Sequence, residues 1–400
     1  MAPAELTVAA ARAEILSGIK PLGSEPVALE AANGRTLACS ATATRAQPPF
    51  RASAMDGYGI RAADLGRGPF TVLGEAAAGR AYAGAPMRSG GAVRILTGAA
   101  VPAGIDLVVP QERARRDGDA VSLEAAPHPR SNIREAGVDF GAGELLVRSG
   151  VRLNARHLAL VAASGAATLE VARRPRVAVL ATGDELVRPG AVAAAHQIFD
   201  SVSIGVGAAI GEWGGEALPL ALRPDSTAAI AAAAADALRR ADLLVVIGGA
   251  SVGDYDVVKQ SLAYLGLEVA FGHVAIRPGR PTWFGRAAGK PVLGLPGNPA
   301  AALVCAHLFL RPLLAAMLGC EADEVAATAI LEGEIAASSA NELYLRAVAA
   351  RGGDTQLRVR PCDNQDTSLL SVFAAANALI RRPAHAGAAA SGERVEMLWL

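Results

Sequence analysis

The sequence has no excess of either charge, because 38 lysines and arginines balance 38 aspartates and glutamates over 400 residues. A balanced charge gives no global sign of binding to nucleic acid or to an acidic membrane surface. Lysine itself is scarce: only Lys20, Lys259 and Lys290 occur, and arginine supplies the remaining positive charge. An arginine at any one position therefore reflects this compositional bias as well as any need for its fork geometry.

Cysteine is sparse too, and targeting signals are lacking. The four cysteines, at positions 39, 305, 320 and 362, show no paired spacing, which argues against a zinc site and fits reduced thiols in a cytosol. The N-terminus lacks a basic segment followed by an apolar run, so we expect no signal peptide. The most apolar helix-length stretch contains His307, Arg311 and Pro312, which favours a buried core helix over a membrane span. We therefore expect a cytoplasmic protein with no membrane or nucleic-acid partner.

Three apolar runs of strand length each end in a polar loop that contains glycine. Residues 243–247 lead into the segment 248–256, and residues 176–181 lead into Thr182-Gly183-Asp184-Glu185. Residues 291–295 lead into Pro296-Gly297-Asn298-Pro299. Runs that are apolar at every position are typical of parallel strands covered by helices on both faces. Because ligands bind beyond the carboxyl ends of such strands, we expect the site where these three loops meet.

Strand and helix patterns alternate from residue 173 to 318, which predicts a doubly wound α/β domain. Residues 70–125 contain short strand-like pieces, with a hairpin signal at Asp117-Gly118, and predict a β-rich domain inserted between helical segments. After Gly319 the pattern predicts a small all-β domain. Its expected strands are 332–335, 344–349, 357–359, 378–380 and 395–400.

Two local motifs point to other functions. Residues 249–253 match a hydrolase nucleophile elbow, with Ser251 as nucleophile and His273, His307 or His385 as base. Two carboxylates follow at once and no His-Gly-Gly segment precedes, which disfavours this hypothesis. Residues 205–211 resemble a dinucleotide fingerprint but lie inside an expected helix, where small residues serve close packing.

Basic and acidic side chains gather near the expected strand ends. Arg277 and Arg280 lie on a proline-rich turn, with His273 just before it, and guanidinium forks suit phosphate or other oxyanions. The neighbouring acids are Asp184, Glu185, Asp225, Asp254 and Asp256. Arginines and acids on one edge suggest a bound phosphate with Mg²⁺. Asp56, in the loop 47–59, is a solvated turn aspartate on its spacing alone.

The chain resembles the molybdopterin molybdenumtransferases, the family of bacterial MoeA and the E domain of gephyrin. The matching segments are 49–50, 53–58, 94–98, 182–186, 248–256, 275–281, 295–299 and 392–396, in order along nearly the whole chain. The resemblance implies a homodimer of four-domain subunits. Its domains would be an elongated linker and dimerisation domain (1–46 and 140–172), an inserted β-rich domain (47–139), a molybdopterin-binding α/β domain (173–318) and a small C-terminal domain like a β-barrel (319–400). The site would lie between the α/β domain of one subunit and the inserted domain of the other.

The resemblance also implies a reaction. Molybdenum from molybdate would be inserted into adenylylated molybdopterin, with Mg²⁺ as cofactor and AMP as product. An adenylyltransferase and recipient molybdoenzymes are the partners that it suggests. The residues with catalytic roles by this resemblance would be Asp56, Thr97, Glu185, Asp225 and Asp256, and the metal ligands would be Asp56, Glu185 and Asp225. The substrate-binding residues would be Gly183, Asp184, Gly248, Gly249, Ser251, Gly253, Asp254, His273, Arg277, Arg280, Pro296, Gly297, Asn298, Pro299, Arg346, Ser368 and Ser371.

The chain departs from the family pattern at a few of these places. The family usually has lysines where this chain has His273, Arg277 and Arg280, and it has an asparagine where this chain has Val202. Histidine is mostly neutral at its ordinary pKa, so a positive charge is weakened. A diverged, non-catalytic molybdopterin-binding or carrier protein is therefore a second hypothesis. Adenylyl transfer from ATP to molybdopterin is a third, although the resemblance over the full length speaks against it.

Overall fold

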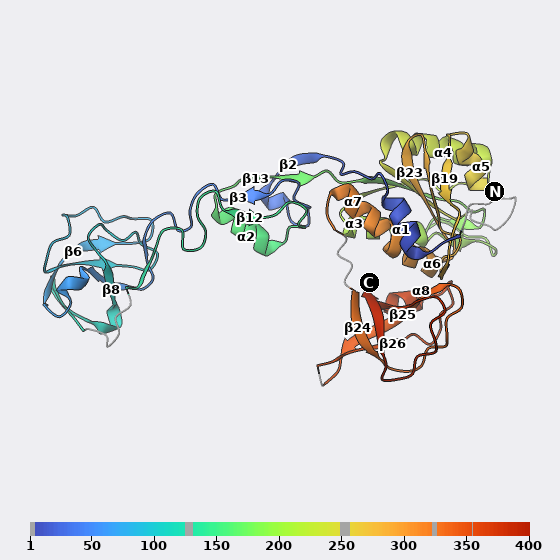
Figure 1. The fold of residues 1–400 in the computed structure, drawn as a ribbon. Helices are drawn as coiled ribbons and strands as arrows, with labels where there is room; N and C mark the ends of the chain where they lie inside the picture. The colour runs from blue at the N-terminus through green and yellow to red at the C-terminus, as the bar shows by residue number, and fades with distance from the viewer. Residues whose placement is uncertain (1–4, 125–130, 249–256, 322–325, 354) are drawn as a thin grey trace.

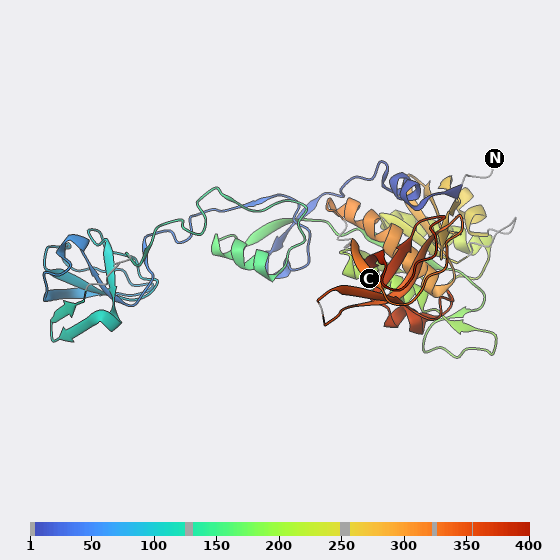
Figure 2. The ribbon, with the colours of Figure 1, turned by 60° about the horizontal axis from the view of Figure 1, so that its bottom comes forward.

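The computed structural model describes residues 5–124, 131–248, 257–321, 326–353 and 355–400. The chain is elongated (Figure 1). A β-rich lobe lies at one end, and a narrow arm connects it to an α/β unit with a small barrel beside it. The view from a second direction in Figure 2 shows the same separation of the lobe from the α/β unit.

The α/β unit is built on one six-stranded sheet of order β17-β14-β18-β23-β22-β19. The strands are β17 (Glu216–Pro219), β14 (Arg176–Ala181), β18 (Leu243–Ile247), β23 (Lys290–Leu295), β22 (Trp283–Ala287) and β19 (Glu268–Phe271). The first four are parallel, and the last two pair antiparallel at one edge. All residues of β18 are buried, because helices cover both faces of the sheet.

Alternate residues of each central strand belong to two different cores. Val179, Val245 and Leu293 pack on one face, while Ala178 and Leu244 pack on the other. Helices α1 (Val8–Leu16), α3 (Val202–Glu212), α6 (Pro299–Cys305) and α7 (Arg311–Leu318) contribute to the first core, and α4 (Thr227–Arg240) and α5 (Val257–Ala263) to the second. The prediction of a doubly wound α/β fold is confirmed.

Two expectations about helices can be compared with the structure. The Gly-rich segment 205–211 lies in α3, where Gly205 packs against Leu303, as expected for helix packing. Helices α6 and α7 join through a π-helical turn, Ala306–Leu310, into one helix from Pro299 to Leu318. This helix is long and apolar enough to cross a membrane, but 83% of its most apolar window is buried inside the protein. That burial is what we expect of a core helix.

The C-terminal part forms a closed five-stranded barrel. Its strands are β24 (Ala326–Leu331), β25 (Glu342–Arg351), β26 (Leu357–Pro361), β27 (Ala378–Arg382) and β28 (Arg394–Trp399). They run in the order β25-β26-β24-β28-β27, and a β25–β27 pairing closes the ring. The expected strand 332–335 is wrong, because β24 ends at Leu331 and Gly333 follows with φ of 103°. The short helix α8 (Leu370–Ala375) was not expected.

The α/β unit and the barrel are tied together by backbone pairing. Strand β20 (His273–Val274) pairs with β1 (Glu5–Leu6), and β21 (Ile276–Arg277) pairs with β25 of the barrel. The basic turn that follows β21 therefore lies at the seam between the two parts.

The lobe at the far end holds a six-stranded sheet of order β8-β5-β7-β6-β10-β9. The strands are β5 (Gly57–Ile60), β6 (Phe70–Ala76), β7 (Gly91–Ile95), β8 (Leu107–Pro110), β9 (Ala114–Asp117) and β10 (Ala120–Leu123). The hairpin predicted at Asp117-Gly118 joins β9 to β10. A two-stranded pairing of β4 (Ala52–Ser53) with β11 (Ile133–Arg134) lies where the chain enters and leaves the lobe.

The arm consists of two passes of the chain that pair with each other. Strand β2 (Ser24–Ala28) pairs with β13 (Thr168–Ala172), and β3 (Ala41–Thr42) pairs with β12 (Leu145–Val147). Helix α2 (Ala155–Ala163) packs on these strands, and Asn154 caps its N-terminus. The lobe is thus an insertion carried on a doubled arm. The domain boundaries given above stay a prediction.

Candidate active site

A cavity of about 580 Å³ lies at the carboxyl edge of the parallel strands. The three glycine loops that follow β14, β18 and β23 contribute to its wall, together with one loop of the barrel. The predicted site residues that line it are Gly183, Glu185, Asp225, Gly248, Pro296, Gly297, Asn298, Pro299 and Ser368. At Gly248, which has φ of 87°, a Cβ would lie 2.8 Å from the carbonyl oxygen of Thr182, so only glycine lets these two loops approach. The structure thus brings together predicted residues from five separated segments, since Asp225 comes from a loop of its own.

Two carboxylates that line the cavity, Glu185 and Asp225, lie close to a third, Asp184, which does not line it. The backbone N–H of Asp225 donates to Asp184 Oδ1 at 3.2 Å, and Glu185 folds back over Gly183. Partial burial raises the pKa of Asp225 above its ordinary value, and the negative charges of Asp184 and Glu185 raise it further. A cation bound between these groups would relieve their repulsion.

The basic turn lies beside the cavity, although its charged groups do not line it. Pro281 is part of the cavity wall, whereas Arg277 lines a second cavity on the side of the barrel. The Nε of Arg280 donates to Glu5 Oε1 at 2.8 Å, and this contact raises the pKa of Arg280. His273 is half-buried in β20, next to Glu5 in the register of β1. Arg280 directly precedes Pro281 in the chain, and its guanidinium is held by Glu5 instead of lining the cavity.

The barrel contributes Ser368, but not its other two predicted residues. Arg346 is 1% exposed, and its guanidinium donates to Gln365 Oε1 and to the carbonyl oxygens of Asp366 and Leu369. Burial lowers the pKa of Arg346 from its ordinary value. Ser371 lines a separate groove next to Cys362. Arg346 thus holds the loop that carries Ser368 and does not line the cavity.

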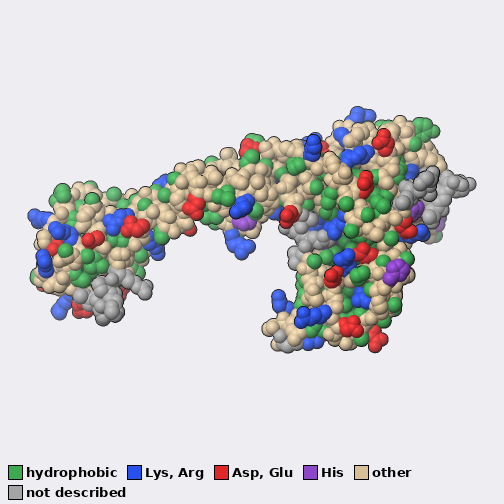
Figure 3. All heavy atoms as spheres, viewed as in Figure 1, with side chains coloured by type: hydrophobic (Ala, Val, Ile, Leu, Met, Phe, Trp, Pro, Cys, Tyr) green, Lys and Arg blue, Asp and Glu red, His purple; other side chains and the backbone are tan. Residues whose placement is uncertain are grey.

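Asp56 and Thr97 form a pair in the far lobe. The backbone N–H and the hydroxyl of Thr97 both donate to Asp56 Oδ1 at 2.7 Å. These two hydrogen bonds lower the pKa of Asp56, and the nearby charge of Arg94 adds to the effect. The lobe lies at the opposite end of the molecule from the cavity, and Figure 3 shows open space along the arm between the lobe and the barrel. Within one chain, therefore, this pair and the cavity do not meet.

Comparison with known proteins assigns the family. The description "MoeA N-terminal region (domain I and II)" matches residues 6–165, "Probable molybdopterin binding domain" matches 178–316, and "MoeA C-terminal region (domain IV)" matches 328–400. The molybdopterin molybdenumtransferase of Haemophilus influenzae is 36% identical over 320 residues, which are 78% of each chain. Molybdopterin molybdenumtransferase 2 of Mycobacterium tuberculosis is 33% identical over 397 residues, 96% of each chain. This chain belongs to the MoeA family.

Solved structures of MoeA proteins have the same fold over the whole length. Two structures of the molybdopterin biosynthesis protein MoeA from Pyrococcus horikoshii superpose with TM-scores of 0.86 and 0.84. They are 29% and 26% identical, and each comparison covers 99% of this chain. The elongated arrangement of lobe, arm, α/β unit and barrel is therefore shared with these two structures.

Several residues that line the cavity were not among the predicted site residues, and Thr182, Asp200 and Phe199 are three of them. Thr182 is 3% exposed and lies in the same loop as Gly183, so its position in the motif could have revealed it. Asp200 is buried, and its Oδ1 accepts from the backbone N–H of Ser203 at the start of α3. Phe199, in β16 (Ile198–Phe199), is 50% exposed and adds an apolar side chain to the cavity wall beside β15 (Leu186–Val187). No sequence pattern marked Phe199.

Some predicted residues of this MoeA protein lie outside the described residues. They are Gly249, Ser251, Gly253, Asp254 and Asp256. In the parts of the chain that the structure describes, no group of three or more His, Cys, Asp or Glu side chains is arranged to hold a metal ion. Mg²⁺ binds through one or two carboxylates plus substrate phosphates, so the paired acids around Asp225 fit that kind of site and not a complete protein cage.

Proposed function

We propose that this chain inserts molybdenum from molybdate into adenylylated molybdopterin and releases AMP. The observation that carries the proposal is the cavity at the sheet edge, where acids from two loops and Ser368 of the barrel meet beside the basic turn. The family, and the transferase names of its curated members, support the same activity. The comparisons give no support to a non-catalytic carrier.

The side chains divide into an acidic and an anion-binding side. Glu185 and Asp225 would hold Mg²⁺, which when bound neutralises charge on the phosphates of the substrate. The hydroxyl of Ser368, once released from Asp366, and the guanidinium of Arg280, once released from Glu5, would bind the oxyanion of molybdate. The apolar wall at Phe199 would exclude water from one side of the substrate. These residues bind and orient the two substrates, and the carboxylates place a water for cleavage of the phosphoanhydride bond.

We further propose that the complete site needs a second copy of the chain. The Asp56–Thr97 pair lies far from the cavity of its own chain. Large apolar side chains are exposed near this pair: Phe50 is 43% exposed and Met55 is 42% exposed. A homodimer in which the lobe of one subunit covers the cavity of the other would bury these side chains and complete the site. The linker along the arm, as divided above, would then hold the two subunits together.

The remaining expectations belong to the same proposal. The protein would act in the cytoplasm, would receive its substrate from an adenylyltransferase and would deliver the cofactor to molybdoenzymes. The test of the function is AMP release from adenylylated molybdopterin in Mg²⁺ buffer, measured with and without molybdate. We expect release that depends on molybdate. Tight binding of the adenylylated pterin without release would refute the insertase and favour a carrier.

A further inference from the structure

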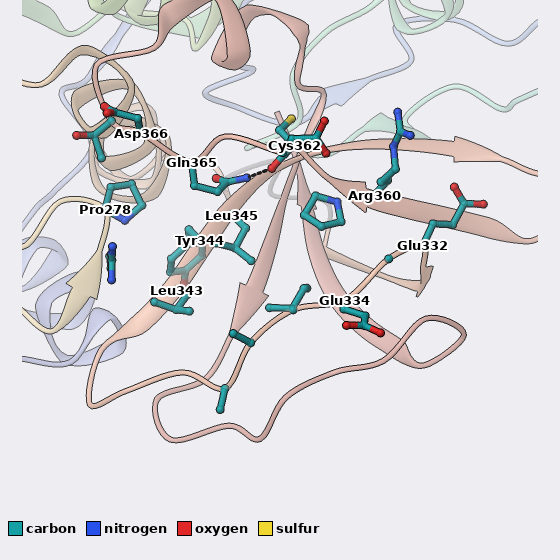
Figure 4. Close-up of a pocket in the computed structure, with 18 residues that line it drawn as sticks. Pro278, Glu332, Glu334, Leu343, Tyr344, Leu345, Arg360, Cys362, Gln365 and Asp366 are labelled. Atoms are coloured by element: carbon teal, nitrogen blue, oxygen red, sulfur yellow. Dashed lines mark hydrogen bonds between the residues drawn. The ribbon is translucent and has the colours of Figure 1, made fainter.

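The loop from Cys362 to Leu369 separates two cavities. Ser368 lines the cavity at the sheet edge, whereas Gln365 and Asp366 line a larger cavity of about 1030 Å³ in the barrel. Figure 4 shows the larger cavity, with Gln365 lying between Tyr344 and Cys362. The position of this loop therefore decides where the Ser368 hydroxyl lies relative to the substrate.

Gln365 uses its side-chain amide to clamp this loop to strand β25. Its Oε1 accepts from the backbone N–H of Arg346 at 3.0 Å and from Arg346 Nε at 3.3 Å. Its Nε2 donates to the carbonyl oxygens of Arg346 and Cys362, both at 2.9 Å. Two donors and two acceptor positions are the full capacity of a glutamine amide, so the side chain has one fitting orientation.

Arg346 extends the clamp to the far end of the loop. Its Nη1 donates to the carbonyl oxygen of Asp366 at 2.9 Å and to that of Leu369 at 3.4 Å. These two residues flank Ser368, whose N–H and hydroxyl both bind Asp366 Oδ1. Because Gln365 accepts from Arg346 Nε, it also fixes the guanidinium that holds this end.

The opposite side of the loop is anchored to the α/β unit. The carbonyl oxygen of Thr367 accepts from the N–H of Ala300, in the first turn of α6, at 2.9 Å. Asn298 Nδ2 donates to Thr367 Oγ1, also at 2.9 Å. The loop is thus held between the barrel and the helix that follows the third glycine loop of the cavity.

We propose that Gln365 is the positioning residue that places Ser368 at the cavity, where its hydroxyl binds the oxyanion once it turns away from Asp366 Oδ1, and that Arg346 acts through this loop. The inference rests on the proposed function, because it assigns molybdate to the cavity that Ser368 lines. Gln365 itself does not contact the substrate. Its loss should weaken molybdate binding more than it slows the chemical step.

The same strand offers a matched control. Asn377 makes a similar clamp on Ala349 of β25: Ala349 N–H donates to Asn377 Oδ1 at 2.7 Å, and Asn377 Nδ2 donates to the Ala349 carbonyl oxygen at 2.9 Å. Both side chains bind the β25 backbone through an amide, but the hydrogen bonds of Asn377 do not reach the loop 362–369. Gln365→Met keeps about the length of the side chain, Asn377→Leu keeps its branching, and each removes the hydrogen bonds of one clamp.

The experiment measures hydrogen exchange of residues 362–369 and the kinetics of molybdate-dependent AMP release for both variants. For Gln365→Met we expect faster exchange in this loop and a rise of about tenfold or more in the KM for molybdate, with kcat changed much less, since a misplaced binding group costs mainly affinity. Asn377→Leu should lower Tm but leave loop exchange and KM near the wild-type values. Gln365→Ala replaces Gln365→Met should the latter not fold.

Other results would overturn the inference, and they differ from a failure of the proposed function. Unchanged loop exchange in Gln365→Met, or equal KM effects in both variants, would show that Gln365 does not position the loop for binding. Faster exchange with an unchanged KM would show that Ser368 does not bind molybdate. A wild-type chain without molybdate-dependent AMP release would refute the proposed function before any variant is compared, and the positioning role with it.

Discussion

Two inactive variants, Asp56→Ala and Asp225→Ala, should restore activity when they are combined in one dimer. Asp56 directly precedes β5 of the lobe, and Asp225 lines the cavity of the α/β unit. The lobe and the α/β unit lie at opposite ends of the molecule (Figure 1). If each site combines the lobe of one subunit with the cavity of the other, a dimer with one copy of each variant has one site with both aspartates and one site with neither. Each variant alone has no intact site.

The recovered activity follows from counting sites. Random association of equal amounts gives about half mixed dimers, and half of the sites in these are intact, so we expect roughly a quarter of wild-type activity per chain. Asp56→Ala should leave the fold intact, because its partner Thr97 is exposed and water can replace the lost acceptor. The assay is molybdate-dependent AMP release after co-expression of the two variants with different tags.

A second mixture controls for subunit exchange. Wild type mixed with the double variant Asp56→Ala/Asp225→Ala gives mixed dimers in which both sites carry one lesion. If the sites are shared, only the dimers of two wild-type chains are active, so we expect about a quarter of the activity of the same total amount of wild-type protein. If each site lies within one chain, we expect about a half. No recovery in the first mixture together with a half in the second would refute a site shared between subunits.

Three further predictions concern stability. Asp225→Asn should abolish Mg²⁺-dependent turnover yet raise Tm at neutral pH, because the raised pKa of Asp225 means that its ionised form destabilises the fold. The gain in Tm should vanish as the pH falls below the ordinary aspartate pKa of about 4. An unchanged Tm at pH 7 would contradict this reasoning. Asp242→Asn should destabilise by about 1–2 kcal/mol, because Asp242 accepts two hydrogen bonds from Arg173 at 2.9 and 3.0 Å. Burial raises the pKa of Asp242, but the hydrogen bonds from Arg173 and from the Arg176 N–H outweigh burial and lower the pKa overall. The stability that Asp242 contributes is therefore present above about pH 4 and is lost as the pH falls through the lowered pKa. Urea titrations at several pH values would detect this loss. Gly279→Ala should lower the free energy of unfolding by about 2–4 kcal/mol, since the new Cβ would lie 2.1 Å from Cys305 Sγ and φ is 111° at this position. In a double-mutant cycle, Cys305→Ala should recover part of this loss. Simple additivity of the two changes would count against the clash.

The α/β fold was predictable because its strands are apolar at every position. β18 is buried along its whole length, because helices cover both faces of the sheet. Every position of the strand therefore carries an apolar residue, and such a run can be recognised in the sequence. The barrel was less predictable at its edges. β24 begins six residues before the expected strand 332–335, and three of its first four residues are alanines, which carry little hydrophobic contrast. Helix α8 is short and has no buried residue, so no periodic signal marked it.

The site was predictable where a motif joins a strand to a loop, and it was not where tertiary contacts decide. Gly183, Gly248 and Asn298 follow strands, and the structure places all three on the cavity wall. Arg346 matched the family motif, yet burial and its contacts with the loop 365–369 keep it out of that wall. Gln365 could not be found from the sequence, since a single glutamine in an irregular loop forms no pattern until the fold brings β25 beside it.

Val202 and His273, the two departures from the family pattern that favoured a carrier, lie in different surroundings. Val202 begins α3, is 7% exposed and packs in the core against the sheet, although it also touches the cavity. The polar groups on that wall come instead from Asp200 and Ser201, so an asparagine at position 202 would add one amide to a wall that already has a carboxylate. His273 does not line the cavity at all. Because neither departure removes a charged group from the cavity wall, they argue for a change in substrate affinity and not for the loss of catalysis.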